Sequence, residues 1–179
     1  MSVDFRVRPR SWDDIGEIAD ELRGQFGLSQ EPYFRIVEFL ELVLDQQIGA
    51  THFLVGTRAG MEGAEGLTDP AGEFIMLCED VYHDACQGQG RARFTSAHEL
   101  GHWMLHTNVP FARIRPDEEP APFRRSEPQA NQFAAELLMP RDFISARDTI
   151  GTIIGGTPSG QLLRDTGYLP TPQGIGSIS

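Results

Sequence analysis

The segment from residue 98 to residue 102 carries two histidines four residues apart, His98 and His102, with Glu99 directly after the first. In a helix, residues i and i+4 lie on one face about 6 Å apart along the axis, so both imidazoles can bind one cation. Zinc accepts imidazole nitrogen readily, and a catalytic zinc site keeps one position for water. Glu99 is turned about 100° from His98, so it can take a proton from that water without ligating the metal. The pattern predicts a hydrolytic zinc site and disfavours a surface pair of histidines.

A third protein ligand must come from outside this run. His106 lies about 12 Å along the helix axis from His98, too far for one ion to contact both side chains. We therefore expect His106 to be a helix-end residue or a partner of a ligating histidine. Glu127 is the preferred ligand because it shares a stripe with apolar positions of a predicted helix, where an unpaired charge would be costly. The alternative for Glu127 is an N-terminal helix charge favoured by the helix dipole.

Further positions on the same predicted helix follow from its periodicity. Asn131, one turn after Glu127, is placed to hydrogen-bond a ligating histidine and fix its orientation. Glu136 falls about 180° from Glu127 and is expected on the solvent face.

Tyr82 and His83, at the predicted end of a strand, are candidates for stabilising an oxyanion by position alone. The competing interpretation is that they are ordinary surface residues.

These residues need a scaffold, which the sequence indicates in outline. Ser11 and Asp14 predict a capping box for a first helix, and Thr95 and the pair Ser126 and Gln129 are candidate caps for the later two. Predicted helices cover residues 11–24, a segment beginning after Pro32, 93–106 and 126–139; predicted strands cover 52–57 and 73–79, with a Gly-rich turn between them.

Length and composition limit the function classes. The chain has 179 residues, 40% of them hydrophobic, and a formal net charge of −11, which fits one compact domain and disfavours direct nucleic-acid binding. It shows neither a secretory signal nor an apolar run long enough to cross a membrane. Cys78 and Cys86 are expected to be reduced thiols, so the protein is expected in the cytoplasm. We expect a domain over 1–145 and an extension over 146–179 whose composition resists packing.

Residues 91–106 and 127–140 resemble the ImmA/IrrE family of metallopeptidases. The second block includes Ala-Asn-x-Phe-Ala and Leu-Leu-Met-Pro elements, and the resemblance spans about residues 73–140. It implies an α+β, compact zincin-like (gluzincin-type) domain, mostly helical with a small β-sheet beside the helix that carries the two histidines. It also implies one Zn²⁺ per chain, with Glu127 as third ligand.

The same resemblance implies an endopeptidase that cleaves a regulatory protein, a helix-turn-helix transcriptional repressor, and thereby switches on stress-response or mobile-element genes. An acidic surface would suit such a basic DNA-binding partner. Two alternatives stay open: a zinc-binding regulatory or interaction module without turnover, and hydrolysis of a small amide by the same water. Glu99 disfavours the first, because a structural zinc site needs no general base and closes with four protein ligands.

Overall fold

The computed structural model describes residues 4–110, 112–115 and 117–141. Within these residues the helices are α1 (Trp12–Gln25), α2 (Ile36–Glu38), the π-helix η1 (Phe39–Ile48), α3 (Glu79–Cys86), α4 (Gly90–His106), the 3-10 helix η2 (Pro122–Arg124) and α5 (Ser126–Leu138). The strands are β1 (Phe5–Arg6), β2 (His52–Gly56), β3 (Gly66–Thr68), β4 (Phe74–Cys78) and β5 (Ala112–Arg113). The predicted α+β class is confirmed.

The strands form two small sheets. In the larger sheet the order is β2-β4-β3, with β2 parallel and β3 antiparallel to β4. In the smaller sheet β1 pairs with β5 in antiparallel fashion. One face of β4 is buried through Ile75 and Leu77, while Met76 between them is partly exposed. The larger sheet therefore covers the helical core with one face only.

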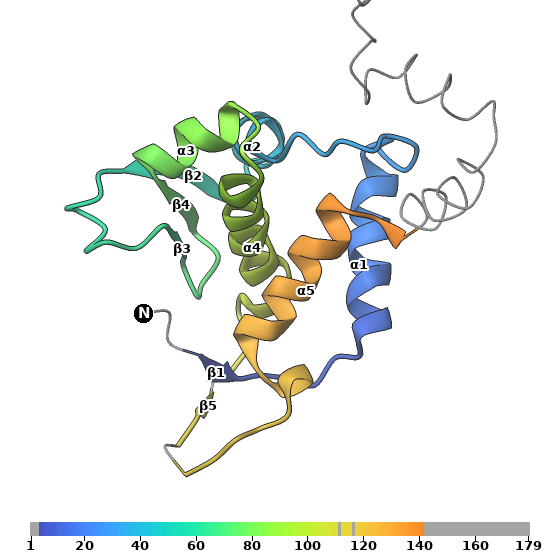
Figure 1. Cartoon of the computed structure of the whole chain (residues 1–179), viewed down its shortest axis with the longest axis vertical. Coiled ribbons are helices and arrows are strands. Elements are labelled where there is room, and N and C mark those ends of the chain that lie inside the picture. The colour runs from blue at the N-terminus through green and yellow to red at the C-terminus, as the bar shows by residue number, and fades with distance from the viewer. Residues whose placement is uncertain (1–3, 111, 116, 142–179) are drawn as a thin grey trace, which may run out of the picture. The chain divides into compact units, whose positions relative to one another are not determined.

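Helix α4 is the centre of the described residues (Figure 1). It contacts α5, α3, β3 and β4, and α1 packs on α5. Buried side chains from these elements and from η1 form one continuous core, which includes Ile15, Leu40, Ile75, Leu100 and Phe133. The helix that carries the histidine pair is thus held between the larger sheet and α5.

Several predicted elements are found with small shifts. Helix α1 begins after Ser11, and the predicted capping box is confirmed: the Ser11 hydroxyl oxygen accepts from the Asp14 amide, and Asp14 accepts from the Ser11 amide, both at 3.0 Å. The helix predicted after Pro32 is also present, with a π-helical second part that its apolar stripe does not reveal. Strands β2 and β4 lie within the predicted ranges.

Other predictions are wrong. Helix α4 begins at Gly90, so Thr95 lies inside the helix and is not its cap. The Gly-rich segment predicted as a turn contains β3, and residues 79–86, whose beginning was assigned to a strand, form α3. Strand β3 has only three residues, and its pairing with β4 is a tertiary contact that local composition does not encode. The predicted extension, 146–179, lies outside the described residues.

Candidate metal centre

The two histidines of α4 and Glu127 of α5 converge on one point. His98 Nε2 lies 3.0 Å from His102 Nε2, and the Glu127 carboxylate oxygens lie 3.4 and 3.3 Å from these two nitrogens. These three residues form a group that could hold a metal ion. Their side chains are 15, 18 and 21% exposed, so the cluster is shielded but still reaches solvent.

A glycine allows α5 to come this close. A Cβ on Gly101 would lie 3.1 Å from the Ala130 backbone oxygen and 3.1 Å from the Phe133 ring. Such distances are shorter than ordinary van der Waals contact between carbon atoms, so a larger residue would push the helices apart. Gly101 therefore sets the α4–α5 spacing that places Glu127 against the histidines.

The first turn of α5 is held by Asp4, near the amino end of the chain. One Asp4 carboxylate oxygen accepts from the Ser126 hydroxyl at 3.1 Å and from the Glu127 amide at 3.2 Å, while the other accepts from Arg125 Nε at 2.6 Å. The Ser126 hydroxyl oxygen also accepts from the Phe5 amide. The predicted capping box of Ser126 with Gln129 is therefore wrong, because Asp4 supplies the acceptor for these helix donors.

Glu99 is buried beside the cluster. Its carboxylate oxygen Oε2 lies 2.7 Å from the Thr68 hydroxyl of β3, which is also 2.9 Å from the Glu99 backbone oxygen. A Cβ on Gly66 would lie 2.5 Å from Glu99 Cγ, so a larger residue at this position of β3 would force the Glu99 side chain to move. Burial raises the pKa of Glu99, against the Thr68 hydrogen bond and the charges of His102 and His98, which lower it. Sequence reasoning missed both β3 residues because they lie in a segment that reads as a turn.

The other imidazole nitrogens have defined partners. His98 Nδ1 lies 2.9 Å from Asn131 Oδ1, the kind of contact expected from the position of Asn131. His102 Nδ1 lies 3.1 Å from His106 Nδ1, and His106 Nε2 lies 3.1 Å from Gln129 Oε1. Burial lowers the pKa of His106 to about 4, so this ring is neutral near pH 7. For His98, burial acts to lower the pKa, but the hydrogen bond with Glu127 and nearby negative charge raise it overall.

Three other residues differ in placement from the sequence expectations. Glu136 is 7% exposed and accepts from Gln132 Nε2, so its assignment to the solvent face is wrong. Because α4 and α1 both pack on α5, more than one stripe of that helix is covered. Tyr82 and His83 lie on α3; Tyr82 donates to Glu41 and packs against Phe53. Their proposed oxyanion role stays a prediction.

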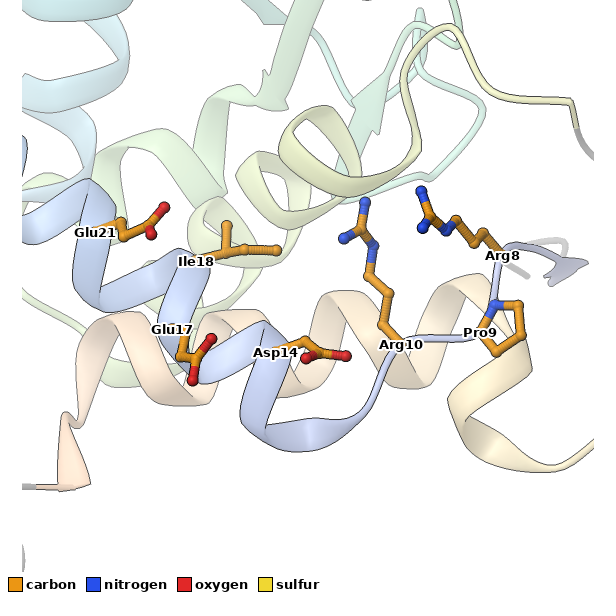
Figure 2. A pocket seen from close by; sticks show the side chains of 7 residues that line it. All are labelled: Arg8, Pro9, Arg10, Asp14, Glu17, Ile18 and Glu21. Atoms are coloured by element: carbon orange, nitrogen blue, oxygen red, sulfur yellow. The ribbon is translucent and has the colours of Figure 1, made fainter.

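A surface pocket lies apart from this cluster, beside α1 (Figure 2). Its lining combines two arginines of the segment before α1 with carboxylates of the helix: Arg8, Pro9, Arg10, Asp14, Glu17, Ile18 and Glu21. Hydrogen bonds from Ser11 lower the pKa of Asp14, and the charges of Arg10 and Arg8 add to that effect. The two arginines therefore offset two of the three carboxylate charges, and among the described residues no group of metal-ligating side chains was found here, so the histidine cluster is the better candidate for chemistry.

Comparison with known families supports that choice. Residues 79–151 match the Peptidase_M78 family model, described as the IrrE N-terminal-like domain, and this segment contains both histidines, Glu99 and Glu127. The match covers less than half of the chain. Among curated proteins and solved structures, no match was found. No helix of the described residues could span a membrane. Over residues 79–151 the chain is therefore similar to the IrrE N-terminal-like domain, and this segment carries every residue of the candidate cluster.

Proposed function

We propose that the chain is a zinc-dependent endopeptidase in which His98, His102 and Glu127 hold one Zn²⁺ and Glu99 is the general base. The observation that carries this proposal is the convergence of three ligand atoms, all within 4.8 Å of one another, beside a buried carboxylate. The family match supports the hydrolase class.

The donor set fits zinc. Ligand atoms about 2.0–2.2 Å from a tetrahedral zinc ion lie about 3.3 Å or slightly more from each other. Here the two Nε2 atoms lie 3.0 Å apart, Glu127 Oε2 lies 3.4 Å from His98 Nε2, and Glu127 Oε1 lies 3.3 Å from His102 Nε2. Two imidazoles and one carboxylate are a known catalytic set that leaves a fourth position for water. The partial exposure of all three side chains is consistent with such an open position.

Glu99, held by Thr68 beside the cluster, can carry out the proton transfers that peptide hydrolysis needs. When bound, zinc would lower the pKa of a water and polarise the scissile carbonyl. The Glu99 carboxylate accepts the proton of the attacking water and delivers it to the leaving amine nitrogen. Thr68 holds Oε2, which leaves Oε1 to receive that proton. Burial favours the protonated form of Glu99, so delivery of the proton is energetically accessible.

The proposed substrate is a regulatory protein in the cytoplasm, a helix-turn-helix repressor. The family resemblance and the net charge of −11 support this substrate, because an acidic enzyme attracts a basic DNA-binding protein. The same cluster in a zinc-binding module without turnover is the second candidate, but such a module would have no use for the buried Glu99.

The test is identification of new protein amino termini. Zinc-loaded full chain and its Glu99→Gln variant are each incubated with lysate of a host strain that lacks the gene, and new termini are labelled and sequenced. Termini within a helix-turn-helix repressor, present only with the wild type, support the proposal. Termini confined to other protein classes refute the substrate, and identical profiles from both proteins with zinc bound refute the enzymatic function.

A further inference from the structure

A series of hydrogen bonds connects His102, through His106 and Gln129, to the backbone at Arg8 and Phe123. His102 Nδ1 faces His106 Nδ1 at 3.1 Å, and His106 Nε2 faces Gln129 Oε1 at 3.1 Å. The Gln129 amide nitrogen then donates to the Arg8 and Phe123 carbonyl oxygens at 2.9 and 2.7 Å. His106 and Gln129 are 2% and 0% exposed, so bulk water does not compete for these bonds.

The two carbonyl groups determine which atom donates in each hydrogen bond of this series. A backbone carbonyl can only accept, so the group of Gln129 that faces both carbonyls must be the NH₂, and Oε1 is left to accept from His106. His106 therefore carries a proton on Nε2 and, as a neutral ring, offers a lone pair at Nδ1. The Nδ1 of His102 must then donate, which leaves its lone pair on Nε2.

We infer that His106 and Gln129 are positioning residues that hold His102 in the Nδ1–H tautomer, with the Nε2 lone pair directed at His98 and Glu127 before any metal arrives. In the other tautomer, Nε2–H would occupy the position that a metal needs. The inference on metal binding rests on the proposed function; the inference on the tautomer does not. His98 differs, since its Nδ1 partner is the exposed Asn131.

The tautomer can be measured without metal. In metal-free protein with ¹⁵N-labelled histidine, at mildly alkaline pH, two-bond ¹⁵N–¹H spectra report which ring nitrogen carries the proton. We expect Nδ1–H for His102 in the wild type and loss of that preference in His106→Phe. His106→Asn should restore it, because Asn Oδ1 occupies the place of imidazole Nδ1. Wild-type His102 protonated only on Nε2, or Nδ1–H kept in His106→Phe, overturns the inference.

Zinc affinity gives a second readout, by competition with a chromogenic chelator. We expect a loss of about 10–100-fold in His106→Phe, recovery in His106→Asn, and no change in the control His52→Asn, whose ring is exposed on β2. Equal affinities of wild type and His106→Phe overturn the positioning role. A wild type that binds no zinc yet shows the Nδ1–H tautomer refutes the metal centre and supports the hydrogen-bond chain.

Discussion

At the residue scale, Glu99 differs from the neighbouring histidines because it lies outside the ligand cluster and is held by Thr68 of β3. It is 8% exposed, and Thr68 lies 2.7 Å from one carboxylate oxygen. Glu99→Gln keeps the size of the side chain and removes the base. We expect zinc content to be unchanged and kcat/KM to fall by about 10²–10⁴-fold. Native mass spectrometry measures the zinc content, and a cleavage assay measures kcat/KM. Retained activity in Glu99→Gln would contradict the mechanism.

Thr68 offers a pH test of the same base. Its hydrogen bond lowers the pKa of Glu99, so removing the hydroxyl in Thr68→Val should raise that pKa further above its ordinary value. A general base works when deprotonated, so the acid limb of the profile of kcat/KM against pH should move to higher pH. Thr68→Ser is the matched control and should keep the wild-type profile. An acid limb that stays in place in Thr68→Val would show that Thr68 does not tune Glu99.

At the scale of elements, β3 approaches α4 closely enough to fix the position of Glu99. In Gly66→Ala the new Cβ would lie 2.5 Å from Glu99 Cγ and 2.6 Å from Oε1, so the glutamate must move. We expect a lower kcat with zinc content retained, because the ligand cluster lies on α4 and α5. Gly90→Ala is the control, since no atom lies within 4 Å of its Cβ position. Equal kcat values for the two variants would refute this role of β3.

The elements also show which parts of the molecule could be predicted from sequence. Helix α1 was predictable because its capping box is local: Ser11 and Asp14 need only each other. Ser126 and Gln129 show the same local pattern, but they bond distant partners instead, Asp4 and His106. Local pattern cannot reveal that competition between near and distant partners.

The same difference between near and distant contacts applies to the site. The spacing of His98 and His102 is a property of one helix, so it could be read directly. The placement of Glu127 required a helical-wheel argument within one predicted helix, and in the structure its carboxylate oxygens lie 3.4 and 3.3 Å from the ring nitrogens of His98 and His102. Thr68 could not be predicted, because only the pairing of β3 with β4 brings it to Glu99.

At the scale of the whole molecule, Arg23 ties α1 to the end of α5. It is 1% exposed, and its guanidinium donates to the Leu137 and Leu28 carbonyls at 2.8 and 3.0 Å and also to the Glu31 carbonyl. A shorter, point-like ammonium in Arg23→Lys cannot satisfy all three acceptors.

We expect Arg23→Lys to lower the free energy of unfolding by about 1–3 kcal/mol, mainly the cost of leaving the buried Leu137 carbonyl unsatisfied. Urea unfolding of the full chain measures it. The control is Arg35→Lys, an exposed residue that pairs with Glu38, for which a change within about 0.5 kcal/mol is expected. Equal effects of the two substitutions would mean that the Arg23 contacts contribute little to stability.

Helices α4 and α5 together are proposed to form one zinc site through Glu127. This proposal is tested most directly by metal content, measured by native mass spectrometry on protein kept from chelators. The wild type is compared with Glu127→Gln and with Glu136→Gln, a buried glutamate of the same helix that lies outside the cluster. We predict about one zinc per chain in the wild type and in Glu136→Gln, and strongly reduced zinc in Glu127→Gln. No zinc in the wild type, or loss confined to Glu136→Gln, would contradict the account.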